Sequence, residues 1–292
     1  MPLPQKQNPA RPPTTTPTRT GKGVLSRIAP IGFDSDDGIK VALYGRSGTG
    51  KTTLWATFPD PILAVICSGG LNSGELRSVD TPANRKRISS VQLNSSAEMR
   101  EIVEHVKTAG TFKTLVVDHV SGLQDLVLKE ILGLDELPAQ KSWGMASREN
   151  YGTCTLQCKE LIRALLNLSG NVVLIAHERS FGDGTESDLI APTIGAAVAP
   201  SLAGWLNGAV DYVCQTFIRQ KEVVKKVTTG QGKLQKTVEI REKVKGVEYC
   251  LRTGPDAVYT TKFRLPRTET DRVPDAIADP NYTKLIKAIR GG

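Results

Sequence analysis

The chain has 292 residues, of which 39% are hydrophobic and 23% are charged, and its formal net charge at pH 7 is +8. This composition is typical of a folded globular protein and excludes a chain that is disordered throughout. No apolar run approaches the roughly 18 residues that a membrane-spanning helix needs, and the N-terminus lacks the apolar core of a secretory signal. We therefore expect a cytoplasmic protein with no membrane partner, whose excess of cations favours a polyanionic ligand.

Residues 1–38 hold repeated proline and threonine, several cations and no hydrophobic period. Sequences of this kind bury too little apolar surface to fold, so we expect a flexible basic arm. A plain linker or terminus is the alternative to an arm that binds DNA. Residues 39–292 are expected to form one α/β domain.

Short β-branched runs alternate with helical patterns along the first part of this domain. The alternation predicts a mostly parallel central sheet with crossover helices on both faces. The expected strands are residues 39–45, 62–67, 88–93, 114–118 and 171–177, and the expected helices begin at Lys51 or lie around residues 99–106, 123–131 and 155–168.

From Val210 onward the pattern changes to an alternation of period two. This period indicates half-exposed strands, and TTGQGK (residues 228–233) lies between two of them as a hairpin turn. We expect the sheet to end in antiparallel strands with a β-hairpin, followed by a short helix at residues 281–289. The alternating runs cover residues 210–218, 222–227, 237–244 and 247–253.

The pattern Gly45-x-x-x-x-Gly50-Lys51-Thr52 lies between an apolar strand and a helix start, which is the full context of a phosphate-binding loop. Its glycines let successive N–H groups turn toward a phosphate at the positive end of the new helix. We expect Lys51 to reach the β- and γ-phosphates of ATP, Thr52 to bind Mg²⁺, and Thr53 to contact the α-phosphate. The expected nucleotide-binding residues are Gly45, Arg46, Ser47, Gly48, Thr49, Gly50, Lys51, Thr52 and Thr53.

Asp118 stands at the carboxyl end of the apolar run TLVVD. A phosphate-loop site needs a second strand that carries a carboxylate for the Mg²⁺ shell, and Asp118 fits this role. The alternative is that Asp118 only caps the following helix.

The motifs LVVDHVSGL, LIAHERS and AVDYV follow the phosphate loop in this order, and together they resemble the RecA-like recombination ATPases. More closely, residues 38–290 are similar to the compact phage ATP-binding proteins of the Sak single-strand-annealing type. The resemblance implies a RecA-like P-loop NTPase core, DNA-stimulated ATPase activity and a homo-oligomeric ring or filament on single-stranded DNA. It also implies a phage-encoded protein in the host cytoplasm, with a single-strand-binding protein as a further partner.

The same resemblance places candidate site residues. His177 ends the strand that carries the γ-phosphate sensor in the family, although a structural histidine is the alternative. The two DNA-binding loops of the family correspond to residues 133–150 and 178–198, where an aromatic ring beside a cation suits single strands. These side chains could instead only attach the loops to the core. The candidates are Lys141, Trp143, Arg148, Arg179 and Phe181.

Lys262 and Arg264 resemble the paired cations that related ATPases insert into the γ-phosphate site of a neighbouring subunit. Two cations on a basic surface are the alternative. The basic run at residues 219–245 is either a second DNA surface or a solvated edge that discourages aggregation.

One position departs from the family pattern. Related enzymes carry a glutamate at the end of the strand that follows the phosphate loop, where it polarises the attacking water. Cys67 or Ser68 occupies that place here. Glu75 and Glu178 are the replacement candidates, so ATP binding is better supported than rapid hydrolysis.

The leading hypothesis is an ATP-dependent protein that binds single-stranded DNA and promotes annealing or strand exchange. A ring-helicase-like motor would instead unwind DNA. A nucleotide-gated replication adaptor or loader would bind DNA with turnover near background.

Overall fold

The computed structural model describes residues 38–67, 74–134, 146–182, 193–229 and 236–291. The side chains of residues 222–229 and 236–243, and of Arg267, Thr270 and Asp271, lie outside this description. The same holds for the arm expected at residues 1–38, apart from Gly38. Within the described part of the chain, no helix is long and apolar enough to cross a membrane.

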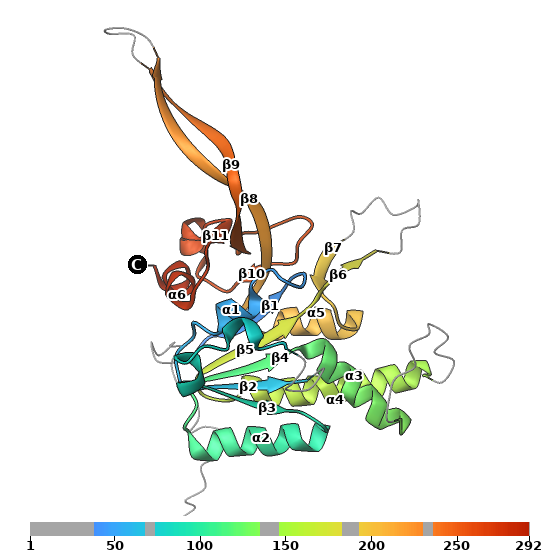
Figure 1. Ribbon diagram of the computed structural model, residues 1–292. Coiled ribbons are helices and arrows are strands. Elements are labelled where there is room, and N and C mark those ends of the chain that lie inside the picture. Colours follow the sequence, from blue (N-terminus) through green and yellow to red (C-terminus); the bar gives the residue numbers. More distant parts are fainter. Residues whose placement is uncertain (1–37, 68–73, 135–145, 183–192, 230–235, 292) are drawn as a thin grey trace, which may run out of the picture. The chain divides into compact units, whose positions relative to one another are not determined.

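One sheet of nine strands runs through the described domain (Figure 1). Its strands are β1 (Lys40–Tyr44), β2 (Ile62–Ile66), β3 (Ile88–Gln92), β4 (Thr114–Asp118), β5 (Asn171–Ala176), β8 (Tyr212–Thr229), β9 (Lys236–Arg252), β10 (Lys262–Phe263) and β11 (Ala276–Ala278). Their order is β11-β9-β8-β1-β5-β4-β2-β3, and β10 pairs with β8. The strands from β8 to β3 are parallel, whereas β9, β10 and β11 pair antiparallel. The expected mixed sheet is confirmed.

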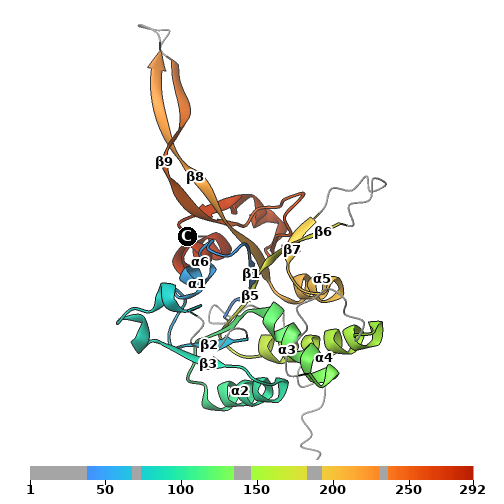
Figure 2. The same cartoon turned by 45° about the vertical axis from the view of Figure 1, so that its right-hand side comes forward.

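Helices cover both faces of this sheet, as the sequence predicts (Figure 2). The helices α2, α3, α4 and α5 pack on one face, and α1 and α6 pack on the other. Their bounds are α1 (Lys51–Trp55), α2 (Ser96–Ala109), α3 (Val120–Leu132), α4 (Arg148–Leu166), α5 (Pro200–Ala209) and α6 (Tyr282–Arg290). Short 3₁₀ helices lie at Arg77–Val79, Asn84–Lys86 and Arg267–Arg272.

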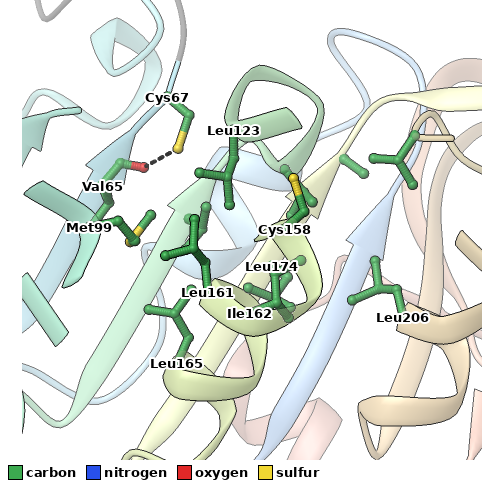
Figure 3. Close-up of a cluster of buried hydrophobic side chains, with 14 of the residues drawn as sticks. Val65, Cys67, Met99, Leu123, Cys158, Leu161, Ile162, Leu165, Leu174 and Leu206 are labelled. Atoms are coloured by element: carbon green, nitrogen blue, oxygen red, sulfur yellow. Dashed lines mark hydrogen bonds between the residues drawn. The ribbon is translucent and has the colours of Figure 1, made fainter. Parts of the chain in front are cut away.

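The larger apolar core lies under α2 to α5 (Figure 3). In α4, Cys158, Leu161, Ile162 and Leu165 are fully buried, and their spacing of three and four residues places them on one side of the helix. Each buried leucine or isoleucine contributes about 1.5–3 kcal/mol through the hydrophobic effect. This stripe therefore fixes α4 against the sheet.

The opposite face has a smaller core. The helix expected to begin at Lys51 has only five residues, because the N–H of Phe58 turns back to the carbonyl of Trp55 and Pro59 follows. Trp55 is fully buried. The C-terminal helix α6 covers the rest of this face, and the ring of Tyr282 packs 4.9 Å from that of Phe58.

The antiparallel hairpin is longer than the sequence suggested. β8 pairs with β1 only from Tyr212 to Gln215 and then continues to Thr229 paired with β9. The four alternating runs are thus two continuous strands, with one register shift between Gln220 and Glu222. The expected turn lies partly outside the described residues, as do most side chains of the basic run at 219–245.

Two features inside the expected loop at 178–198 and after it were not predicted. β6 (Glu178–Phe181) and β7 (Thr193–Ala196) form a separate two-stranded sheet. α5 follows, although it contains Gly204 and Gly208, which lower helix propensity. Burial of Leu202, Ala203 and Leu206 outweighs that propensity.

The side chain of Asn171, at the start of β5, joins the segments that precede β1 and β4. Its Oδ1 accepts the N–H of Ile39 at 3.1 Å, and its Nδ2 donates to the carbonyl oxygen of Lys113 at 3.3 Å. We expect Asn171→Ala to lower the free energy of unfolding by about 2 kcal/mol, since the buried N–H of Ile39 loses its partner. Urea denaturation measures this loss.

The matched control is Asn167→Ala, because Asn167 is exposed at the end of α4. We expect that variant to change stability by less than about 0.5 kcal/mol. Equal losses for the two variants would contradict a bridging role for Asn171.

Candidate functional site

The phosphate loop turns sharply after β1. Gly48 and Gly50 have φ angles of 79° and 89°, in the left-handed region that favours glycine. A Cβ on Gly45 would lie 2.4 Å from the carbonyl oxygen of Thr216 in β8. The hydroxyl of Thr49 hydrogen-bonds that of Thr216 at 2.7 Å. The loop is therefore shaped against the neighbouring strand β8.

Lys51 begins α1 and is buried. Its ammonium donates to the carbonyl oxygens of Gly45 and Arg46, both at 2.8 Å. Burial lowers the pKa of Lys51, while the carboxylates of Asp118 and Glu178 act in the opposite direction. The cation is thus held within the loop, where phosphate oxygens can accept from it.

Asp118 ends β4 and is also buried. Burial raises the pKa of this carboxyl, against the effects of a hydrogen bond from Trp55 and of nearby Lys51 and His177. The indole Nε1 of Trp55 donates to Oδ2 at 3.3 Å. A buried carboxylate is costly in a site of low dielectric, and a bound cation would compensate its charge.

A cavity of about 700 Å³ joins the loop to Asp118, which is within the size range of small-molecule sites. His177 and Glu75 also line it. The hydroxyl of Thr52 and the carboxylate of Asp118 are oxygen donors of the kind that Mg²⁺ prefers, so these residues fit the expected ion. Arg46 and Gly45 lie outside the lining, whereas the other predicted nucleotide-binding residues line it: Ser47, Gly48, Thr49, Gly50, Lys51, Thr52 and Thr53.

Two histidines meet at this cavity. The rings of His119 and His177 lie 4.4 Å apart in an edge-on arrangement. Burial lowers the pKa of His177, and burial with the nearby His177 lowers the pKa of His119 to about 4. Both rings are therefore neutral at pH 7. Sequence reasoning gave His119 no role, although its place directly after Asp118 at a strand end was the available signal.

The glutamate that activates water in related enzymes would stand at the end of β2. Cys67 is buried at the end of β2, so no carboxylate stands there. Glu178 accepts from Arg46 at 3.0 Å and from Gln215 at 2.9 Å, and it does not line the cavity. Glu75 lines the cavity. Its catalytic role stays a prediction.

A second cavity, of about 740 Å³, is lined by both Arg148 and Arg179. These two residues were predicted to contact DNA from different loops. Arg148 begins α4, where a capping box between Ser147 and Asn150 fixes the helix start. Arg179 lies on β6, and its guanidinium is 5.7 Å from the ring centre of Phe181. The remaining candidates, Lys141 and Trp143, lie outside the described residues.

Lys262 and Arg264 are held by their own chain. The ammonium of Lys262 donates to the carbonyl oxygens of Asn207 and Val210 at 2.7 Å. Arg264 forms an ion pair with Asp211 at 2.9 Å. Both cations thus stabilise the C-terminal end of α5, and their action on a neighbouring subunit stays a prediction.

Residues 37–265 match a protein family described as AAA domain. The chain belongs to this family of P-loop ATPases. The match covers the phosphate loop, Asp118 and His177, and it confirms the expected ATPase at the level of the family. The closer resemblance to Sak-type annealing proteins stays a prediction.

A search of curated proteins found no match to this chain. Among solved structures, the chain is similar to a prototypical ATPase from the type III secretion system of pathogenic bacteria, with 15% identity and a TM-score of 0.39 over 61% of this chain. This chain spans about half of the length of that ATPase (52%). The RadB recombinase matches at 15% identity and a TM-score of 0.38, over 75% of this chain and 89% of RadB. The flagellar accessory protein FlaH from Methanocaldococcus jannaschii matches at 7% identity and a TM-score of 0.36, over 74% of this chain and 78% of FlaH.

The contact between Trp55 and Asp118 predicts a defect in metal binding. Mg²⁺ should raise the affinity for ATP about threefold to tenfold less in Trp55→Phe than in the wild type. The reason is that Asp118 loses a hydrogen bond from the indole, and a hydrogen bond to a charged group is a strong one. ATP binding without Mg²⁺ should be unchanged. Calorimetric titrations at several Mg²⁺ concentrations measure both quantities.

Trp205→Phe is the matched control, because Trp205 lies on α5 and does not line the cavity. If both tryptophan variants lose Mg²⁺ dependence to the same extent, the orientation of Asp118 does not depend on Trp55.

Proposed function

We propose that this protein is an ATPase that binds single-stranded DNA in a nucleotide-dependent manner and promotes annealing or strand exchange. The observation that carries the proposal is the hydrogen-bonded path between two cavities. One holds the phosphate loop with Asp118 and His177, and the other brings Arg148 and Arg179 together.

The first cavity supplies the groups that nucleotide binding requires. The amides of the loop and the ammonium of Lys51 bind the phosphates, and Thr52 and Asp118 hold Mg²⁺. Mg²⁺ supplies positive charge that offsets the charge of the phosphates. A neutral His177 can donate one N–H to a phosphate oxygen and so respond to the state of the nucleotide.

The second cavity supplies groups that suit a single strand. Arg148 and Arg179 can meet the phosphate backbone, and Tyr151, which is 37% exposed, offers a ring for stacking. Contacts to the phosphate backbone and stacking on a ring do not depend on which base is bound, so these groups suit binding without sequence preference.

Short covalent and hydrogen-bonded paths join the two cavities. β4 carries Asp118 and leads directly into α3, whose Ser121 donates to the carbonyl oxygen of Ala197 at 2.6 Å. The N–H of Ala197 donates to the carbonyl oxygen of His177 at 2.8 Å. Ala197 and Ser121 both line the second cavity. A shift of His177 on nucleotide binding would thus reach the DNA side through a rigid connection.

A nucleotide-gated adaptor is the second candidate function. Cys67 and Glu178 favour it, because Cys67 has no carboxylate and the hydrogen-bonded carboxylate of Glu178 does not line the cavity. Assembly as a ring or filament, with Lys262 and Arg264 acting on the neighbouring subunit, belongs to either candidate.

Turnover measured with and without single-stranded DNA tests the proposal. We expect DNA to stimulate ATP hydrolysis by the wild-type protein, and Lys51→Ala to reduce nucleotide affinity and turnover at least about tenfold, since its cation binds the phosphates. Lys113→Ala is a matched control, because Lys113 does not line the cavity. Background turnover together with ATP-dependent DNA binding would favour the adaptor instead.

Charge reversal tests the DNA cavity. Arg148→Glu and Arg179→Glu should each weaken binding of single-stranded DNA on the order of tenfold and lower the slope of affinity against salt concentration, because a phosphate contact is lost. Fluorescence anisotropy with a labelled oligonucleotide measures both effects.

Arg85→Glu makes the same change of charge on a residue outside this cavity. A loss of DNA affinity as large as those of the cavity variants would point to net charge alone. Nucleotide affinity should remain at the wild-type value in all three variants.

A further inference from the structure

One side of the nucleotide cavity is lined by residues other than the phosphate loop and the expected Mg²⁺ ligands. In the sheet, β5 and β4, which lead to His177 and Asp118, lie on one side of β1, while β8 and β9 lie on the other. From this second side, Tyr249 of β9 and the C-terminal residues Asp279 and Pro280 line the cavity. An aromatic ring therefore stands in the cavity beyond the phosphate loop.

The ring of Tyr249 lies directly against the loop. A Cβ on Gly50 would be 3.4 Å from Cδ1 of Tyr249 and 4.0 Å from Cγ. Tyr249 is 42% exposed, whereas the next two residues, Cys250 and Leu251, are fully buried. Exposed aromatic surface inside a cavity is stabilised when a flat apolar ligand face removes it from water.

The backbone of Tyr249 is held from two directions. It pairs with Ile218 of β8, and its carbonyl oxygen accepts the N–H of Asp279 at 2.8 Å. The C-terminal segment is in turn attached beside α1, where the N–H of Tyr282 donates to the hydroxyl of Thr57 at 2.8 Å. A ring on such a fixed backbone loses little conformational freedom when a ligand binds.

We propose that Tyr249 is the stacking platform for the base of the bound nucleoside triphosphate. The inference rests on the proposed nucleotide function. Phosphates bound by Gly48–Lys51 leave the ribose and base to extend away from the loop, and the cavity of about 700 Å³ has room for them. The ring beside Gly50 meets the face of the base. Tyr249 thus adds base-dependent affinity to a loop that recognises only phosphates.

Two ligands separate the base from the phosphates. Tyr249→Ala should weaken binding of magnesium ATP about tenfold in calorimetric titrations, because stacking between base and ring is lost. Binding of magnesium tripolyphosphate, which has no base, should equal that of the wild type. Tyr249→Phe keeps the ring and should bind ATP within about twofold of the wild type.

Val247→Ala is the matched control, because Val247 lies two residues away on β9, is 60% exposed and does not line the cavity. Thermal unfolding checks that each variant is folded, and Tyr249→Leu, which keeps apolar bulk without a ring, replaces the alanine variant if that one fails to fold.

Equal ATP affinity of Tyr249→Ala and the wild type would overturn the proposal. Equal losses of ATP and tripolyphosphate binding would also overturn it, since the defect would then concern the phosphate loop. If the wild-type protein binds neither ligand, the nucleotide function itself fails, and the role of Tyr249 fails with it.

Discussion

The confinement of the phosphate loop between β1 and β8 is the constraint on which the rest of the site depends. β1 is a central parallel strand, so its carboxyl end is fixed by neighbours on both sides. On the β8 side, Thr216 approaches Gly45 so closely that no side chain fits there, and it hydrogen-bonds Thr49. The loop can therefore hold its amides in place before a ligand arrives, which reduces the entropy cost of binding.

The same edge of the sheet collects the other functional groups. The carboxyl ends of parallel strands meet at one edge, which is the usual position of ligand sites in open α/β sheets. Asp118 ends β4 at that edge, and His119 and His177 directly follow β4 and β5. Because β4 and β5 also continue into α3 and β6, the residues that meet the nucleotide are close in the chain to those that line the second cavity.

A chain of polar side chains extends this connection toward the long hairpin. Arg46 of the loop donates to Glu178 on β6, and Gln215 on β8 donates to the other oxygen of the same carboxylate. The amide oxygen of Gln215 accepts from Arg252 on β9 at 3.0 Å. The loop, the β6–β7 sheet and the first part of the β8–β9 hairpin thus share one hydrogen-bonded network. Glu178 is better explained as a member of this network than as a base that activates water.

The sequence by itself determined the phosphate loop, the place of Asp118 at a strand end and the mixed sheet, because these depend on local spacing and on periodicity within single strands. Only the tertiary structure decided that α1 is a single turn, that Arg148 and Arg179 share a cavity, and that Tyr249 stands against Gly50. The physical reason is distance along the chain. Gly50 and Tyr249 meet only because the sheet places β8 and β9 beside β1, and no local pattern records such an approach between strands.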